Sequence, residues 1–133
     1  MNANAASTDQ KAFMRLPWLR SEQKAWSYIL RAASLKDMNN LFIAGFNYLQ
    51  EDFAQYLFKD SPQYDFVQRD NKKAFTFIKE SADLGNFRAI YTAGMMYQYG
   101  IGTAISKPQA LVYYEKLADD RADLSELLIK QLQ

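Results

Sequence analysis

Two stretches of the chain repeat the same order of residues, and this repeat constrains the fold more than any single motif. Lys24–Tyr48 and Lys73–Tyr97 align at a constant offset of 49 residues. Eight aligned pairs are identical: Lys24/Lys73, Ala25/Ala74, Ile29/Ile78, Ala33/Ala82, Leu35/Leu84, Ala44/Ala93, Gly45/Gly94 and Tyr48/Tyr97. In repeat proteins each unit buries its apolar face against its neighbours. The alignment therefore predicts one repetitive architecture in this 133-residue chain.

The spacing of apolar residues in the second copy is helical. They recur at three- and four-residue intervals in two stripes: Ala74, Phe77, Ile78, Ser81, Ala82 and then Ala89, Ile90, Ala93, Met96, Tyr97. Such spacing places each stripe on one face of a helix. Asp70 and Asn86 suit the two N-caps, and Gly85 suits the left-handed position that closes the first helix. We predict an antiparallel helical hairpin.

Small residues recur where the two helices of a pair would cross. Gly94 sits in the middle of a predicted helix, where glycine is unfavourable, and it recurs as Gly45. Close packing of helix axes accounts for this recurrence better than tolerance of a weak residue does. Phe77 and Tyr97 would fill the grooves beside the crossing.

A third copy begins after the turn at Gly100 and Gly102. Ser106 or Lys107 would cap its first helix, with Pro108 in the first turn. Its stripe is Ala110, Tyr113, Tyr114, Leu117 and Ala118, which begins 36 residues after Ala74. Residues 124–132 would form a short final helix that ends the array.

The first copy departs from this pattern. Lys36 replaces the glycine of the helix–helix turn, although Asp37 still matches Asn86 as a cap. After Tyr48 an insertion at residues 51–69 replaces the Gly-x-Gly turn. We expect the second helix of this copy to continue to about Phe58, and a break at Ser61-Pro62 to begin a loop.

A short helix is expected before the first copy, at residues 7–18. Ser7 and Gln10 have the spacing of a capping box, and Pro17 would end the helix. Its apolar residues would cover the exposed flank of the first repeat: Phe13, Met14, Leu16 and Trp18.

The order of these residues resembles the Sel-like repeat (SLR, Sel1-like) family of the tetratricopeptide superfamily. The shared pattern is Lys-Ala, an aromatic residue, Leu-Gly-Asn, Ala-Gly, Tyr, Gly-x-Gly and Pro-x-Ala, which residues 73–110 match along almost their full length. The resemblance implies an all-α superhelical solenoid of about 2.5 repeats with an N-terminal capping helix. We expect a single domain over residues 1–133: repeat 1 at 21–69, repeat 2 at 70–105 and a truncated repeat 3 at 106–133. The family also implies a non-enzymatic adaptor or scaffold that binds another protein, mainly in bacteria.

Composition excludes several classes of function. The chain has neither cysteine nor histidine, which removes disulfides, zinc sites built on those ligands, and triads that need imidazole. Its net charge is +1 without a basic block, which argues against nucleic acid or an anionic membrane as partner. The first residues are polar and no window is apolar enough to span a bilayer, so we expect a cytoplasmic protein.

Carboxylates offer no convincing active site or metal site. Glu51 and Asp52 are adjacent, and adjacent helix residues do not face one another. The acidic group Asp119, Asp120, Asp123 and Glu126 complements a helix dipole without needing a cation. We therefore predict no catalytic residue, no metal and no cofactor. A carboxylate- or cofactor-dependent enzyme is the alternative of a different class.

Two surfaces are candidates for binding a protein partner. The insertion supplies aromatic residues that repeat packing does not demand: Tyr56, Phe58, Tyr64 and Phe66. They could instead pack over the preceding helix. The outward face of the first helices of the repeats supplies the second set: Trp26, Arg31, Thr76, Lys79 and Glu80. Aromatic and arginine residues are enriched at interfaces. A sharper hypothesis is an immunity protein that neutralises a toxin, and the sequence leaves both monomer and homodimer open.

Overall fold

The computed structural model describes the backbone of residues 3–133 and the side chains of residues 17–133. Within residues 3–133 the chain is helical and contains no strand. The helices are α1 (Ala3–Ser34), α2 (Met38–Tyr48), α3 (Glu51–Leu57), α4 (Asn71–Asp83), α5 (Phe87–Tyr99), α6 (Lys107–Lys116), the 3-10 turn η1 (Leu117–Asp119) and α7 (Ala122–Leu132). The predicted all-α class is confirmed.

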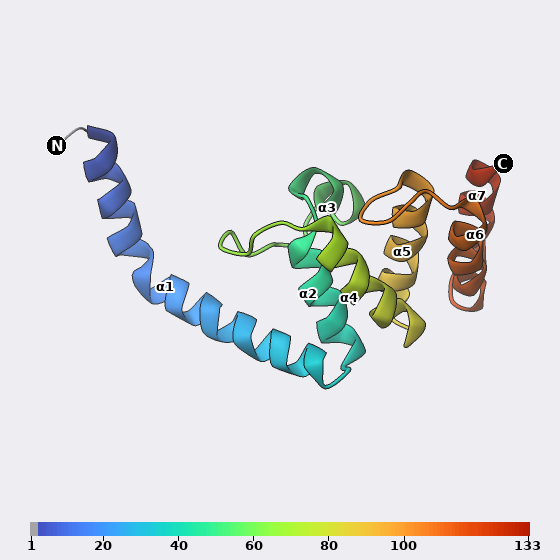
Figure 1. Ribbon diagram of the computed structural model, residues 1–133, viewed down its shortest axis with the longest axis horizontal. Coiled ribbons are helices and arrows are strands. Elements are labelled where there is room, and N and C mark those ends of the chain that lie inside the picture. Colours follow the sequence, from blue (N-terminus) through green and yellow to red (C-terminus); the bar gives the residue numbers. More distant parts are fainter. Residues whose placement is uncertain (1–2) are drawn as a thin grey trace.

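Consecutive helices pack in pairs, and the pairs stack in one row (Figure 1). The pairs are α1 with α2, α4 with α5, and α6 with α7. Between pairs, α2 packs on α4 and α5 packs on α6. The C-terminus consequently lies at the opposite end of the row from α1. This arrangement is the repetitive solenoid that the internal alignment predicts.

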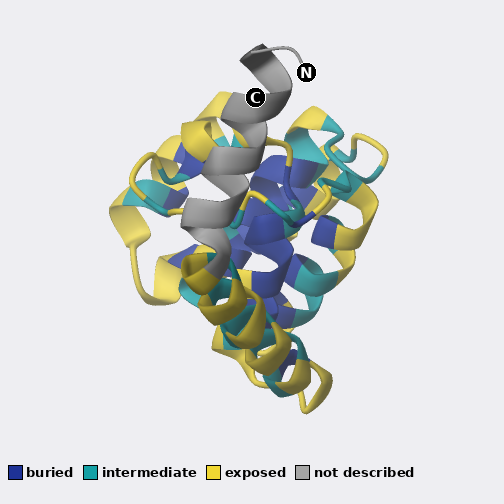
Figure 2. Ribbon diagram, turned by 90° about the vertical axis from the view of Figure 1, so that its left-hand side faces the viewer, coloured by how far each residue is buried: buried dark blue, intermediate teal, exposed yellow. Residues whose placement is uncertain are grey.

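The core lies between the stacked helices (Figure 2). It includes most of the predicted stripe positions: Ala74, Ile78, Ser81, Ala82, Ala89, Ile90, Ala93, Met96, Ala110, Tyr113, Tyr114 and Leu117. Phe77 and Tyr97 are half-buried at its edges. The prediction for Ala118 is wrong, since this residue is exposed. The α-helical register ends at Lys116, and the tighter η1 turn rotates position 118 out of the stripe.

Side-chain caps start the helices where the sequence predicts them. Asp37, Asp70, Asn86 and Ser106 each accept a hydrogen bond from a backbone N–H in the first turn of the helix that follows. Such a bond satisfies a donor that has no partner inside the helix. Local capping therefore sets four of the helix starts.

The turn between α1 and α2 contains an unusual backbone conformation. Gly85, between α4 and α5, has a φ of +104°, and Lys36 has a φ of +66° at the equivalent point of the first pair. Glycine adopts this region freely, whereas for a residue with a Cβ it costs about 1–2 kcal/mol. The Lys36 side chain also forms an exposed ion pair with Glu80.

We expect the Lys36→Gly variant to be more stable than Lys36→Ala by about 1 kcal/mol, because only glycine relieves the left-handed strain. Both variants lose the ion pair with Glu80, so their comparison isolates the backbone effect. Urea unfolding of the two variants measures the difference. Equal urea midpoints for the two variants would contradict a left-handed backbone at Lys36.

The N-terminal helix is longer than predicted. Helix α1 runs through Pro17 without ending and joins the first helix of repeat 1. A proline removes one backbone hydrogen bond, and helix-favouring residues on both sides can outweigh that loss. The predicted capping box at Ser7 and Gln10 and the packing of Phe13, Met14 and Leu16 lie outside the described side chains. Trp18 is 72% exposed and does not cover the first repeat.

Helix α2 is shorter than predicted, and the expected continuation to Phe58 is wrong. Leu49 has an extended backbone with ψ of 145° and is fully buried. The backbone N–H of Gln50 donates to the Asn71 side chain at 3.0 Å, and that of Asp70 donates to the Tyr48 carbonyl at 2.6 Å. These contacts with the start of α4 replace further helical bonds. The chain resumes as α3 and then leaves residues 58–70 without helix, in line with the predicted loop.

Candidate functional site

Residues 58–70 fold back over the C-terminal end of α2. The Gln63 side-chain amide donates to the carbonyls of Phe46 at 2.8 Å and Leu49 at 2.9 Å. The Arg69 guanidinium donates to the Asn47 carbonyl at 2.6 Å. Carbonyls at the end of a helix have no partner within it. The insertion thus serves as the cap of α2, and this role fixes its path.

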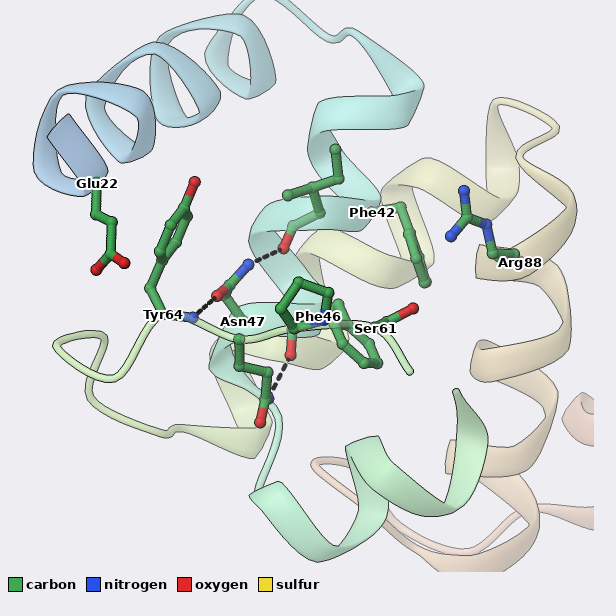
Figure 3. Close-up of a pocket in the computed structure, with 10 residues that line it drawn as sticks. Glu22, Phe42, Phe46, Asn47, Ser61, Tyr64 and Arg88 are labelled. Atoms are coloured by element: carbon green, nitrogen blue, oxygen red, sulfur yellow. Dashed lines mark hydrogen bonds between the residues drawn. The ribbon is translucent and has the colours of Figure 1, made fainter. Parts of the chain in front are cut away.

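Asn47 fastens the middle of the insertion to α2. It is 2% exposed, and its side-chain oxygen accepts the backbone N–H of Tyr64 at 2.6 Å (Figure 3). Its amide nitrogen donates to the Ile43 carbonyl at 2.9 Å. A buried amide held at both ends has one orientation, since turning it would leave polar groups unpaired. The backbone of Tyr64 is positioned accordingly.

The insertion brings its aromatic residues against α1. The Trp26 ring lies edge-on to Tyr48 and Tyr64, at centroid distances of 5.6 and 6.0 Å. Tyr64 stacks on Phe66 at 5.3 Å, and Tyr48 stacks on Phe77 at 5.7 Å. Two surfaces that the sequence treats as alternatives therefore meet: Trp26 of the first helix face and Tyr64 with Phe66 of the insertion.

A cavity of about 350 Å³ opens on one side of this cluster, between α1 and α4. We call it the α1/α4 hollow and define it by Trp26, Tyr48, Phe66, Arg69, Asp70 and Lys73. The Lys73 ammonium lies 5.3 Å from the centre of the Tyr48 ring. Asp70 is engaged by the backbone N–H groups of Lys72 and Lys73. The rim of the hollow carries two cations, Arg69 and Lys73, and one carboxylate, Asp70, and is therefore positively charged.

A second cavity, of about 490 Å³, lies where α2, α5 and the insertion meet (Figure 3). We call it the α2/α5 groove and define it by Phe42, Ile43, Phe46, Pro62, Tyr64 and Arg88. Glu22 of α1 also lines it. The Arg88 guanidinium lies 5.4 Å from the centre of the Phe42 ring.

The remaining predicted residues of the helix face lie outside both cavities. Thr76 donates its hydroxyl to the Lys72 carbonyl at 3.2 Å, and Glu80 pairs with Lys36. Arg31 is exposed on α1. Their predicted role in binding therefore has no support from either cavity.

Lys79 belongs to a polar network between α4 and α6. Its ammonium donates to Asp83 at 2.9 Å, and the Tyr113 hydroxyl donates to the same carboxylate at 2.8 Å. Burial opposes ionisation of Asp83, but the hydrogen bonds from Lys79 and Tyr113 outweigh it and hold its pKa below the usual value. This network joins two repeats. It gives Lys79 a structural role that does not require a binding partner.

The two other aromatic residues of the insertion have different environments. Tyr56 is 69% exposed on α3. Phe58 packs edge-on against Phe42, Phe46 and Tyr91 at centroid distances of 5.9 to 6.0 Å. The sequence analysis leaves two roles open for Phe58, binding a partner or packing over the preceding helix. The structure places Phe58 in the second role.

Sequence reasoning missed several residues of the cavities. The sequence marks Tyr48 and Lys73 only as repeated positions, and nothing in it places Arg69 beside them. The groove residues Phe42, Ile43 and Arg88 carry no sequence signal that separates them from ordinary helix positions.

The acidic residues do not gather into a metal site in the part of the chain whose side chains are described. Asp123 pairs with Arg121 at 3.2 Å and Glu126 with Lys130 at 3.4 Å. Over the same range, no helix combines the length and the hydropathy that crossing a bilayer requires.

Comparison with known proteins identifies the fold. The chain matches no protein-family model and no curated protein. It is similar to a Sel1 repeat protein from Oxalobacter formigenes of known crystal structure, with a TM-score of 0.66 and 26% sequence identity over 80% of this chain. The chain spans 27% of the length of that protein. Together with the internal repeat, this similarity shows that the chain has a Sel1-like repeat fold, an all-α superhelical solenoid.

Proposed function

We propose that this chain is a non-enzymatic protein–protein interaction module that binds a segment of another protein in the α1/α4 hollow. The observation that carries the proposal is the aromatic cluster in which Trp26 of α1 contacts Tyr64 of the insertion and Tyr64 stacks on Phe66, with Trp26 and Phe66 both lining the hollow. We further propose a bacterial, cytoplasmic protein in which residues 1–133 form one domain with repeats at 21–69, 70–105 and 106–133.

The aromatic cluster is organised before any partner arrives. Gln63, Arg69 and Asn47 hold the insertion through hydrogen bonds to α2. A preformed site avoids the entropic cost of ordering a loop on binding. Tryptophan, tyrosine and arginine also supply much of the binding energy at interfaces. The cationic rim favours a partner segment with an acidic residue beside an apolar one.

The carboxylates support a binding role over an enzymatic one. Glu51 and Asp52 are both exposed in the first turn of α3. Acidic residues there stabilise the helix dipole, and neither the hollow nor the groove includes them. Turnover of a substrate that stopped on substitution of Glu51 or Asp52 would overturn the non-enzymatic proposal.

The test of the hollow is a partner co-purified from the organism that encodes the chain. With that partner, Phe66→Ala and Trp26→Ala should each weaken binding by about 30-fold, or about 2 kcal/mol, as measured by calorimetry. The exposed Gln55→Ala on α3 is the matched control and should leave affinity unchanged. If Thr76→Ala weakened binding and Phe66→Ala did not, the partner would occupy the helix face instead of the hollow.

An immunity protein that neutralises a toxin is the second candidate. One long insertion that is rigidly fastened to its scaffold suits tight binding of a single partner. The test is a pull-down with the neighbouring gene product. A complex no tighter than about micromolar, about −8 kcal/mol, would count against this candidate. Light scattering on the free and bound protein would separate a monomer from a homodimer.

A further inference from the structure

The α2/α5 groove has an apolar rim that stays exposed among the residues whose side chains are described. Phe42 and Phe46 lie at its base with ring centroids 5.8 Å apart, but they are only 4% and 3% exposed and contribute little of its surface. Ile43 stands at the rim and is 40% exposed. Pro62 of the insertion lines the groove from the other chain segment. A cavity of about 490 Å³ between these residues has room for one or two large apolar side chains.

One end of the groove carries a cation that forms no ion pair among residues 17–133. Arg88 is exposed, and its guanidinium lies 5.4 Å from the centre of the Phe42 ring. The ion pairs of the described side chains all involve other residues. An arginine stacked on an aromatic ring keeps its outward N–H groups accessible to a carboxylate, which it can bind through two parallel hydrogen bonds.

The opposite end of the groove carries the opposite charge. In Figure 3 Glu22 lies beyond the Tyr64 ring, while Arg88 lies on the far side of Phe42. Charges of opposite sign at the two ends would orient a bound segment, because a carboxylate is attracted to Arg88 and repelled by Glu22.

We propose that the α2/α5 groove is a second docking site, which binds a partner segment that has one or two large apolar side chains and a carboxylate at the end that meets Arg88. The apolar side chains lie against Ile43 and Pro62, above the buried rings of Phe42 and Phe46, and the carboxylate pairs with the guanidinium. This site shares no cation with the α1/α4 hollow, and the Tyr64 backbone is fixed independently by Asn47. A chain with both sites joins two partners, which goes beyond the single site proposed above.

The experiment is selection of peptides from a random display library, about 12 residues long, on the wild-type protein with counter-selection on Arg88→Gln. We expect enriched peptides to combine large apolar residues with Asp or Glu at one end. Fluorescence polarisation should then show that Arg88→Gln weakens a selected peptide by at least about tenfold. Ile43→Glu should weaken it as well, by placing a charge at the apolar rim. Both residues are exposed, so these variants should keep the fold, as circular dichroism can verify.

Two controls separate this site from the hollow and from general charge attraction. Lys73→Gln should leave the peptide affinity unchanged, because Lys73 is exposed and lines the hollow and not the groove. Replacing the peptide carboxylate by its amide should weaken binding to wild type but not to Arg88→Gln. Such non-additive effects would show that the carboxylate contacts Arg88. The proposal is overturned if no peptide is enriched, if the enriched peptides lack carboxylates, or if they bind Arg88→Gln as well as wild type. Peptides that depend on Lys73 would also overturn it and would support the hollow alone.

Discussion

Gly94→Ala is expected to lower the free energy of unfolding by about 2–3 kcal/mol, the cost of inserting an atom into a filled core. A Cβ at this position would lie 2.7 Å from Cδ1 and 3.1 Å from Cζ of Tyr114. Tyr114 cannot retreat easily, because it is fully buried and its hydroxyl donates to Gln98 at 2.6 Å. At a helix position without such a neighbour, alanine would instead stabilise by about 1 kcal/mol. Denaturant unfolding therefore tests the sign of the effect as well as its size.

The contact between Gly94 and Tyr114 can be isolated with a double-mutant cycle. In a Tyr114→Leu background, which removes the ring, most of the cost of Gly94→Ala should disappear. The exposed Gln55→Ala on α3 should change stability by less than about 0.5 kcal/mol. A cost of Gly94→Ala that is the same in both backgrounds would show that the ring is not the obstacle.

Asn47→Ala is expected to destabilise the protein by about 2–3 kcal/mol and to loosen the insertion selectively, since a buried polar group left without a partner costs about 1–3 kcal/mol. The substitution removes the acceptor of the Tyr64 backbone N–H and the donor to the Ile43 carbonyl. Because Tyr64 and Phe66 depend on this anchor, binding in the α1/α4 hollow should weaken even at temperatures where the variant stays folded.

Hydrogen exchange of the Tyr64 amide gives the local measurement for Asn47→Ala, and urea unfolding gives the global one. The matched control is Gln68→Ala, which changes an exposed residue of the same segment. Exchange at Tyr64 should accelerate strongly in Asn47→Ala and stay as in wild type in Gln68→Ala. Unchanged protection in both variants would mean that the insertion is held by something other than Asn47.

The helix pairs could be predicted because their determinants are local. Asp70, Asn86 and Ser106 cap helices through bonds that span two or three residues, and the apolar stripes follow helical geometry. A tight helix contact at Gly94 could also be predicted, because the glycine recurs at the equivalent position, Gly45. The partner helix could not: the sequence places this contact within the hairpin, whereas Gly94 meets Tyr114 of α6 and Gly45 meets Ile78 of α4, each in the next pair. The similarity to a Sel1 repeat protein agrees with the predicted helix pairs.

The predictions that were wrong depended on contacts between distant residues. Helix α2 ends at Tyr48 because Asp70 and Asn71, more than about 20 positions later, bind its end and the next N–H. Nothing in the sequence around Tyr48 marks that end. Pro17 lies inside α1 although proline usually marks a boundary, because loss of one hydrogen bond does not outweigh the helix on both sides.

The sequence by itself determined the class of the fold, the helix pairs, most of the core and the residue types that exclude imidazole or thiolate chemistry. These follow from periodicity, capping and composition, which act over a few residues at a time. Only the tertiary structure decided that Trp26 meets Tyr64 and Phe66, that Phe58 covers the core, and that Arg88 stands over Phe42 at an open groove. The physical reason is that a binding surface is made of side chains from separate helices. Their meeting depends on how the insertion caps α2, and that arrangement is not encoded in any local pattern.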